Sequence, residues 1–304
     1  MALIVLVPDA EGEAALSQLD GVRPVRYEAD APLPPEAAEA EVLIPPFLSV
    51  ERVLELVGRL PRLRLVQLLT AGVEPWIGRL PEGIALSNAR GAHGGSTAEW
   101  VLTVLLAVYR DLPAFLTAQA ERRWDYHSTD TVQGKRVLVV GAGDLGQQVR
   151  RRLDAFDAHT TLVARRARPG VHAVDELPAL LGEHDAVVLV VPLTEQTRGL
   201  VDADFLARMP DGAVLVNAAR GPVVDTEALI TELRRGRLRA ALDVTDPEPL
   251  PADHPLWTAP NVLITPHVGG SCRGSRERSY AVAAAQIAKF AAGGQPDNLV
   301  LGEY

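Results

Sequence analysis

The stretch Arg136-Val-Leu-Val-Val-Gly-Ala-Gly-Asp-Leu-Gly146 decides the fold. Four apolar residues, three of them β-branched, run into a Gly-x-Gly-x-x-Gly pattern, which predicts a buried strand turning sharply into a helix. Gly141 permits the tight turn, Gly143 lets backbone N–H groups approach a pyrophosphate, and Gly146 lets the helix pack on its strand. The helix, expected from Asp144 to about Phe156, points its N-terminus at that anion. The stretch therefore predicts a dinucleotide site.

The glycine pattern alone is weak evidence, because ordinary strand-to-helix turns are rich in glycine and methyltransferases use related loops. A methyltransferase would bind S-adenosylmethionine at the same turn. The residues that follow the later strands decide between these interpretations.

The length, charge and cysteine content narrow the class of protein. The chain of 304 residues is long for one hydrophobic core and suits two domains. Its 30 basic and 39 acidic residues give a formal charge of -9, which argues against broad binding to nucleic acid or an anionic membrane. The single cysteine, Cys272, excludes an intrachain disulfide and a cysteine-built metal site, and no metal is expected. The opening Met-Ala-Leu-Ile-Val-Leu-Val indicates a strand rather than a signal peptide or membrane span, so a cytoplasmic protein is expected.

The rest of the chain alternates short apolar runs with amphipathic stretches, which is typical of parallel α/β sheets. Before the glycine turn, strands are expected at 3–7, 41–44, 63–68 and 84–86, and helices at 11–19 and 51–60. After it, strands are expected at 160–164, 186–191, 213–217, 240–244 and 262–265, and helices at 176–181, 202–209 and 226–235. With the strand before the glycines, the second region has the six strands of a doubly wound nucleotide fold. A last helix at 275–290 leads to Asn298-Leu299-Val300, which is expected to return to the first domain.

Two stretches connect these regions. Ser96-Thr97-Ala98-Glu99 has a capping residue followed by an acid, which predicts the start of a long apolar-periodic helix through Tyr109. This helix is expected to be the crossover and hinge. Residues 118–133 are polar apart from Trp124 and Tyr126, and they are interpreted as a loop that contributes to a subunit contact.

The end of the second nucleotide-fold strand indicates the cofactor. An acid at this point, about 20 residues past the glycines, binds the ribose hydroxyls of NAD. Ala164 stands there instead, followed by Arg165, Arg166 and Arg168. Without a carboxylate to repel it, a 2′-phosphate can pair with these guanidinium groups. We therefore expect NADP(H) to be preferred, while NAD(H) is possible if the arginines are only a solvated basic loop.

Three later segments carry chemistry beyond nucleotide binding. Arg220 follows the expected strand at 213–217, Asp243 and Glu248 lie at and past the end of the next, and His267 follows the last. The carboxyl ends of parallel strands meet at one edge of the sheet, where the nicotinamide must lie. These side chains are therefore expected to converge there.

At these motifs the chain resembles the D-isomer-specific 2-hydroxyacid dehydrogenase family. The likeness covers nearly all of the chain, and the motifs in this order are highly specific: Gly141-Ala-Gly-Asp-Leu-Gly, Pro192-Leu-Thr with Thr197, Asn217-Ala-Ala-Arg-Gly with Val224-Asp225, Leu242-Asp-Val through Glu248-Pro249, and Thr265-Pro-His-Val-Gly-Gly. The resemblance implies Arg220, Glu248 and His267 as the catalytic trio. It also implies an α/β fold in which a doubly wound Rossmann domain, 98–271, is inserted in a doubly wound flavodoxin-like substrate domain, 1–97 and 272–304.

The resemblance further assigns binding residues. Asp243 is implied to accept a hydrogen bond from the nicotinamide carboxamide. Cofactor contacts are implied for Thr97, Gly141, Gly143, Asp144, Leu145, Gly146, Arg165, Arg166, Arg168, Pro192, Thr197, Ala218, Asp243, Gly269 and Gly270. Ala71, Gly72 and Val73 follow an expected strand, where small residues present backbone N–H groups to a ligand. With Arg220 they are expected to bind the substrate carboxylate.

The chemistry of a 2-oxo acid reductase fits the trio independently. His267 suits the acid that protonates the carbonyl oxygen, because imidazole titrates near neutral pH, and Glu248 would orient it. Arg220 can grip the substrate carboxylate in a planar fork. One departure from the family pattern is Asp157, which replaces the usual glycine before the second strand and puts the arginine positions in question. Another is Ala71, which stands where phosphite dehydrogenases carry lysine and disfavours that activity.

The sequence therefore predicts a reductase that converts a small 2-oxo acid, such as glyoxylate or hydroxypyruvate, to the D-2-hydroxy acid with NADPH. One alternative is a dinucleotide-sensing binding protein, like the corepressors that share this fold. A second is an NAD-dependent dehydrogenase of another D-2-hydroxy acid, such as phosphoglycerate. Related enzymes suggest a homodimer.

Overall fold

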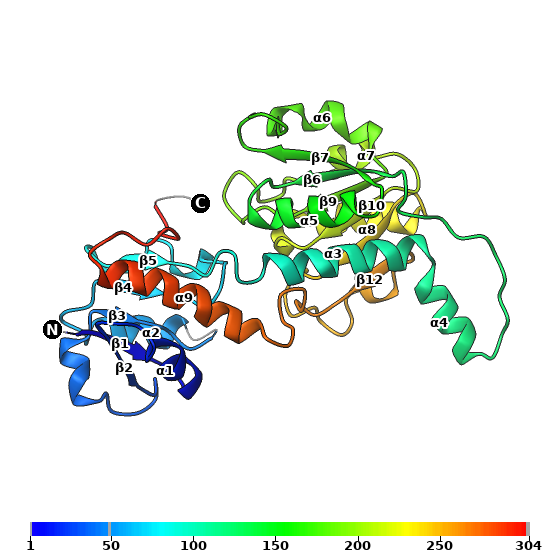
Figure 1. The fold of residues 1–304 in the computed structure, drawn as a ribbon. Coiled ribbons are helices and arrows are strands. Elements are labelled where there is room, and N and C mark those ends of the chain that lie inside the picture. Colours follow the sequence, from blue (N-terminus) through cyan, green and yellow to red (C-terminus); the bar gives the residue numbers. More distant parts are fainter. Residues whose placement is uncertain (1, 48–49, 302–304) are drawn as a thin grey trace. The chain divides into compact units, whose positions relative to one another are not determined.

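Two parallel β-sheets organise the protein, and each belongs to its own compact unit (Figure 1). The computed structural model describes residues 2–47 and 50–301, and the ends of the predicted substrate domain at 1 and 302–304 lie outside this part. The terminal unit comprises Met1–His93 with Arg273–Tyr304, and the central unit comprises Gly94–Cys272. The sequence placed these boundaries at 97/98 and 271/272. The α/β class with two parallel sheets is confirmed.

The terminal unit has a five-stranded sheet in the order β2-β1-β3-β4-β5, which is the flavodoxin-like order. Its elements are β1 Leu3–Val7, α1 Ala10–Leu16, β2 Val22–Arg26, η1 Pro35–Glu39, β3 Val42–Leu43, α2 Val50–Val57, β4 Leu65–Gln67, η2 Glu74–Trp76, β5 Ala85–Ser87 and α9 Ser275–Ala291. β2 was not predicted from the sequence. This strand lies at the sheet edge, where Pro24, which has no N–H group, is tolerated.

The segment after α9 returns to the terminal sheet as predicted. Leu299 pairs antiparallel with Ser87 of β5, and Asn298 Nδ2 donates to the Asn88 carbonyl oxygen at 3.1 Å. At the start of α9, Tyr280 Oη donates to Asp9 Oδ2 at 2.8 Å. These contacts attach α9 and the segment after it to the start of α1 and to β5.

The central unit, in which every residue is described, has a seven-stranded sheet in the order β12-β11-β10-β9-β6-β7-β8. Its strands are β6 Arg136–Val140, β7 His159–Ala164, β8 His172–Ala173, β9 Ala186–Leu189, β10 Val214–Asn217, β11 Arg239–Leu242 and β12 Val262–Ile264. Its helices are α3 Gly94–Tyr109, α4 Leu112–Ala120, α5 Asp144–Asp154, η3 Val174–Glu176, α6 Leu177–Leu180, η4 Leu181–Glu183, α7 Ala203–Arg208, η5 Gly221–Val223, α8 Thr226–Arg234 and η6 Pro255–Thr258. Six of the strands were predicted, and the two-residue β8 is too short to give a hydrophobic signal.

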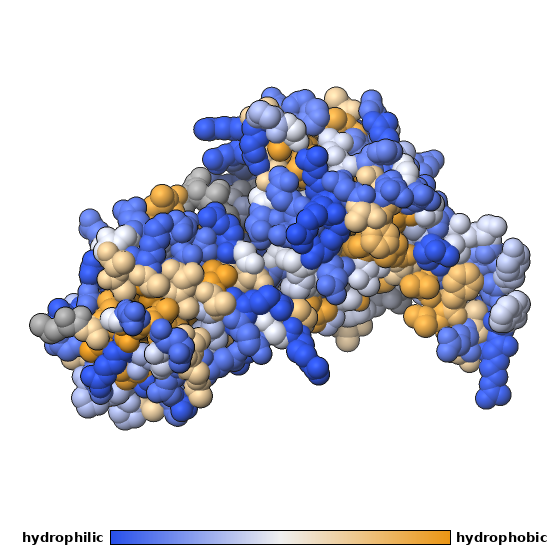
Figure 2. Space-filling model, viewed as in Figure 1, coloured by the Kyte–Doolittle hydropathy of each residue, from blue (hydrophilic) through white to orange (hydrophobic). Residues whose placement is uncertain are grey.

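Two predictions about the start of the central unit were wrong in part. α3 begins at Gly94, so Ser96 and Thr97 lie inside its first turn instead of capping it. The expected loop at 118–133 begins inside α4, and only the residues after Ala120 lack regular structure. We call α4 and this following segment, residues 112–134, the arm. Figure 2 shows apolar side chains exposed over α4, where Leu112 and Leu116 are 48% and 65% exposed.

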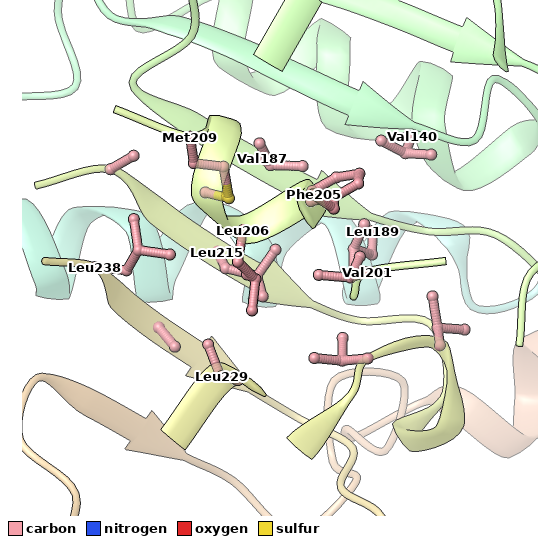
Figure 3. Packing of buried hydrophobic residues seen from close by; sticks show 14 of the residues in the cluster. Val140, Val187, Leu189, Val201, Phe205, Leu206, Met209, Leu215, Leu229 and Leu238 are labelled. Carbon is pink, nitrogen blue, oxygen red and sulfur yellow. The ribbon is translucent and has the colours of Figure 1, made fainter. Parts of the chain in front are cut away.

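The central sheet is covered on both faces, so its strands are apolar on both sides. Val137 and Val139 pack with residues of α3 and α5, whereas Leu138 and Val140 face the opposite side. Figure 3 shows that opposite core, whose labelled members are Val140, Val187, Leu189, Val201, Phe205, Leu206, Met209, Leu215, Leu229 and Leu238. Among the described residues no single helix is long and apolar enough to cross a membrane, and α3 with α4 meets that test only as a pair bent by 64°.

Candidate active site

The glycine turn after β6 has the geometry that its sequence predicts. Gly141 has φ +118°, and a Cβ atom there would lie 2.7 Å from the Val190 carbonyl oxygen. A Cβ on Gly146 would lie 1.9 Å from the Gly141 carbonyl oxygen, so glycine lets α5 approach β6. At Gly143, whose φ is −78°, a Cβ would meet no heavy atom of the described residues within 4 Å. The turn therefore leaves space for a pyrophosphate at the N-terminus of α5, and a dinucleotide fits the residues present.

The candidate 2′-phosphate arginines begin where the sequence places them. β7 ends at Ala164, and Gly141 N donates to the Val163 carbonyl oxygen at 2.8 Å, which puts this strand end beside the glycine turn. Arg165 and Arg166 are exposed. Arg168 reaches back, because its Nη2 donates to the Ala142 carbonyl oxygen at 2.7 Å. The guanidinium group of Arg168 is thus held against the glycine turn.

The turn before β7 keeps its shape despite the departure at Asp157. Asp157 adopts the left-handed conformation with φ +56°, which aspartate tolerates better than most residues. Its carbonyl oxygen accepts from Gly134 N at 2.9 Å. An aspartate thus takes a backbone conformation that favours glycine, and β7 ends at Ala164, directly before the arginines, as the sequence predicts.

His267 and Glu248 lie in direct contact. His267 Nδ1 is 2.6 Å from Glu248 Oε1, although the two residues are 19 positions apart. Both side chains are partly exposed, at 48% and 40%. His267 has φ +54°, in the left-handed region. The convergence predicted for these two residues is therefore present in the central unit.

Arg220 lies at the end of β10, in a turn packed against the loop that leads to Glu248. A Cβ on Gly221 would lie 1.9 Å from the Thr245 carbonyl oxygen, so this contact requires glycine. The buried Asn217 braces the turn, since its Nδ2 donates to the Arg220 carbonyl oxygen at 3.0 Å and its Oδ1 accepts from Ala219 N at 3.0 Å. The Arg220 guanidinium donates to the Ala219 carbonyl oxygen at 2.7 Å.

Asp243 is buried at the end of β11, with an exposed fraction of 4%. Its Oδ1 accepts from Thr265 Oγ1 at 2.6 Å and from Val268 N at 2.9 Å. Its Oδ2 accepts from Gly269 N at 2.8 Å. The carboxylate thus binds the loop that carries His267.

The other residues assigned to the cofactor occupy the central unit. Thr197 closes the loop after β9, because its Oγ1 donates to the Pro192 carbonyl oxygen at 2.6 Å. Ala218 follows β10, and its N–H donates to the Leu189 carbonyl oxygen at 3.1 Å. Asp144 begins α5, and its carboxylate lies against Gly94 of α3, where a Cβ would be 2.1 Å from Oδ2. The remaining members are Thr97 on α3, Leu145 on α5, and Gly269 and Gly270 after His267.

The predicted carboxylate-binding residues Ala71, Gly72 and Val73 lie in the terminal unit. They follow β4, and Thr70 Oγ1 donates to the Gly72 carbonyl oxygen at 3.0 Å, which closes the turn. Asn88 Nδ2 donates to the Ala71 carbonyl oxygen at 2.9 Å. Their role in substrate binding stays a prediction.

Three supporting residues did not stand among the predicted site residues: Asn217, Gly221 and Thr265. Asn217 and Gly221 bracket Arg220, and Thr265 bonds Asp243. A polar residue at the end of an apolar strand is a signal that could have identified Asn217 and Thr265. The contact at Gly221 depends on how closely two loops approach, which the sequence does not reveal.

The glycine turn, the dinucleotide fold and the His267–Glu248 pair define a nicotinamide-dependent oxidoreductase. Residues 102–269, more than half of the chain, match the family described as "D-isomer specific 2-hydroxyacid dehydrogenase, NAD binding domain". The chain belongs to this family and is an NAD(P)-dependent oxidoreductase. The methyltransferase alternative is excluded by this membership.

The names of individual relatives are more specific than the description of the family. A glyoxylate reductase/hydroxypyruvate reductase from Mus musculus is 32% identical in an alignment of 298 positions that covers 90% of this chain and 90% of that protein. A D-3-phosphoglycerate dehydrogenase from Methanocaldococcus jannaschii is 35% identical in an alignment of 228 positions that covers 72% of this chain but 43% of that longer protein. A D-isomer specific 2-hydroxyacid dehydrogenase from Xanthobacter autotrophicus, solved with NADPH and MES, has a TM-score of 0.83 and 32% identity, and the match covers 99% and 98% of the two chains.

Proposed function

We propose that this protein is a cytoplasmic reductase that converts glyoxylate, hydroxypyruvate or a similar small 2-oxo acid to the D-2-hydroxy acid with NADPH. The observation that carries the proposal is the 2.6 Å contact between His267 and Glu248 at the carboxyl edge of a dinucleotide-binding sheet. The mouse glyoxylate reductase/hydroxypyruvate reductase supports the substrate class, since it matches over 90% of both chains.

Each member of the trio has a defined task in this reduction. With Glu248 ionised, His267 Nδ1 donates to it, so Nε2 is the nitrogen that gives a proton to the carbonyl oxygen. Glu248 fixes the ring and stabilises the imidazolium. Arg220 binds the substrate carboxylate through its guanidinium fork. A bound nicotinamide cofactor supplies the hydride.

The preference for NADPH rests on the end of β7. Ala164 offers no carboxylate to the ribose, and Arg165 follows it directly. Arg168, bonded to the Ala142 carbonyl oxygen, lies against the glycine turn. The relative from Xanthobacter autotrophicus was solved with NADPH. These features favour a 2′-phosphate over a free hydroxyl.

A panel of 2-oxo acids assayed with NADPH and with NADH tests both parts of the proposal. We expect turnover of glyoxylate or hydroxypyruvate and a kcat/KM that is at least about tenfold higher with NADPH, since a charge-assisted hydrogen bond is worth about 1.5–3 kcal/mol. Arg165→Ala and Arg168→Ala should lower this ratio. Arg208→Ala is the control, because Arg208 is the last residue of α7 and is not among the predicted cofactor-binding residues. This variant should leave the ratio of kcat/KM values for NADPH and NADH unchanged.

Other outcomes of the panel identify the alternatives. A preference for NADH with 3-phosphohydroxypyruvate would favour a dehydrogenase of the phosphoglycerate type. Absence of turnover with every acid, together with cofactor-dependent binding to a protein partner, would favour the corepressor-like function. Either result would reject the proposed activity.

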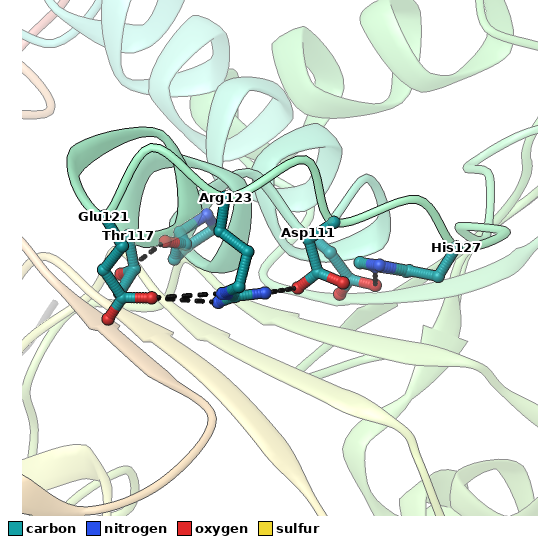
Figure 4. A network of polar contacts seen from close by, with 7 residues as sticks. Asp111, Thr117, Glu121, Arg123 and His127 are labelled. Atoms are coloured by element: carbon teal, nitrogen blue, oxygen red, sulfur yellow. Dashed lines mark hydrogen bonds and ion pairs between the residues drawn. The ribbon is translucent and has the colours of Figure 1, made fainter.

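The arm supports a homodimer, which we propose as the working form. Trp124 and Tyr126 are 95% and 87% exposed, and aromatic side chains are enriched at interfaces between proteins. Figure 4 shows polar contacts within the arm and with the residue before it, including Arg123 with Glu121 at 3.1 Å and His127 with Asp111 at 3.3 Å. A segment with unburied aromatic rings fits a surface that a second copy covers.

Sedimentation at micromolar concentration should therefore give twice the 32.6 kDa of one chain. The double variant Trp124→Ser with Tyr126→Ser should sediment as a monomer, because it removes the exposed rings. Phe47→Ser, which changes a side chain that is 64% exposed in the terminal unit, should stay dimeric. A monomeric wild type, or a dimeric double variant, would contradict the proposal.

A further inference from the structure

The loop that carries His267 is held by one buried side chain. Asp243 accepts hydrogen bonds from Thr265 Oγ1, Val268 N and Gly269 N, at 2.6, 2.9 and 2.8 Å. The carbonyl oxygen of Asp243 also accepts from His267 N at 2.7 Å. Donors on both sides of His267 therefore converge on a single residue.

His267 needs this support because its backbone is in an unfavourable conformation. Its φ of +54° is left-handed, which costs about 1–2 kcal/mol for a residue with a Cβ atom. Such conformations persist where surrounding contacts over-determine them. The bonds to Asp243 are those contacts, and they set the direction in which the ring leaves the loop.

Gly269 shows that the loop is fitted to the carboxylate. A Cβ at this position would lie 2.9 Å from Asp243 Oδ2 and 3.4 Å from Cγ of Trp100. A Cβ atom there would force the Asp243 carboxylate to shift, so glycine lets Gly269 N approach Asp243 closely.

We infer that Asp243 is a positioning residue, which acts through Thr265 and the Val268 and Gly269 amides to hold His267 against Glu248. An ionised carboxylate offers about four acceptor sites and no donor, so it matches these donors. An asparagine has an NH₂ group in place of one carboxylate oxygen. In one orientation this donor faces the Thr265 hydroxyl and Val268 N–H, and in the other it faces Gly269 N–H. At least one hydrogen bond is lost in either orientation. The role deepens the proposed function, on whose assignment of His267 as the acid it rests.

This role differs in its consequences from the carboxamide contact that family resemblance assigns to Asp243. A residue that only binds the cofactor changes the dissociation constant of the cofactor. A residue that positions His267 changes kcat, because displacement of a catalytic group by about 1 Å can cost on the order of 100-fold. The two roles are separated by measuring both quantities.

The test compares Asp243→Asn and Thr265→Val with the conservative variant Thr265→Ser. We expect Asp243→Asn to lower kcat by about 10- to 100-fold at saturating cofactor, with the dissociation constant for the cofactor within about threefold of wild type. Thr265→Val should lower kcat in the same direction, and Thr265→Ser should restore it by keeping the hydroxyl. In a His267→Asn background, Thr265→Val should have no further effect, because both changes act through one group.

Proton NMR of the cofactor-free protein supplies a readout independent of turnover. The wild type should show a low-field Nδ1 proton from the His267–Glu248 hydrogen bond, which Glu248→Gln identifies by abolishing it. Asp243→Asn should lose or broaden this signal, whereas Asp202→Asn should retain it, because Asp202 only caps α7 and asparagine caps equally well.

The outcomes separate this inference from the proposed function. An unchanged NMR signal and kcat in Asp243→Asn, with a cofactor dissociation constant raised more than about tenfold, would leave Asp243 as a cofactor contact and overturn the positioning role. A wild type that reduces none of the 2-oxo acids but loses the signal in Asp243→Asn would reject the proposed activity while retaining the positioning of His267. Circular dichroism verifies that each variant is folded.

Discussion

Replacing His267 with alanine is expected to lower kcat by at least about 10³-fold while the dissociation constant of the cofactor stays within about threefold of wild type. The reason is that the ring whose Nδ1 lies 2.6 Å from Glu248 Oε1 is the proposed acid, and alanine offers no proton at that point. Steady-state kinetics give kcat, and a fluorescence titration with NADPH gives the dissociation constant.

The left-handed backbone of His267 requires a second variant. Alanine is strained at φ +54°, whereas asparagine adopts this conformation more readily and still cannot act as an acid. His267→Asn should therefore fold like the wild type and show the same loss of turnover. Glu248→Gln, which keeps a hydrogen-bonding group but removes the negative charge, should lose less. Retention of more than about one-tenth of wild-type turnover by His267→Asn would contradict the acid role, since a general acid contributes about 10²–10⁴-fold.

The sheets could be predicted from sequence because their strands are buried on both faces. Such strands are continuous apolar runs, and the expected strand at 186–191 contains β9, Ala186–Leu189. β2 gave no such signal, because it is a half-buried edge strand of sequence Val-Arg-Pro-Val-Arg. The helix propensities of the individual residues also predicted the wrong start for α3. Gly94 is a poor helix former, but it lets the Asp144 carboxylate lie close to the first turn, where a Cβ atom would force that carboxylate to move.

The predicted meeting of Glu248 and His267 follows from topology. The strands that precede them, β11 and β12, are neighbours in the sheet, so their carboxyl ends lie side by side. The support of the site could not be inferred in the same way. The bonds of Asp243 and the contact of Gly221 with Thr245 depend on how loops approach each other, and strand order does not determine that approach.

Substitution of glycines in the pyrophosphate turn is the second change for which we expect a large effect. Gly146→Ala is expected to destabilise the protein by about 3 kcal/mol, because it forces an atom against a backbone carbonyl that cannot move without opening the turn. The new Cβ would lie 1.9 Å from the Gly141 carbonyl oxygen. Urea denaturation followed by circular dichroism measures the loss as a lower midpoint.

Gly143→Ala should behave in the opposite way, although it lies three residues away in the same motif. Its φ of −78° suits alanine, and its Cβ would meet no described atom within 4 Å. The variant should therefore unfold within about 0.5 kcal/mol of wild type. Its affinity for NADPH should fall by about 100-fold, since the methyl group takes the space into which a pyrophosphate approaches the backbone. A Gly143→Ala protein that binds NADPH like the wild type would mean that the phosphates lie elsewhere. The pair of variants thus separates the glycine that the fold requires from the glycine that the cofactor requires.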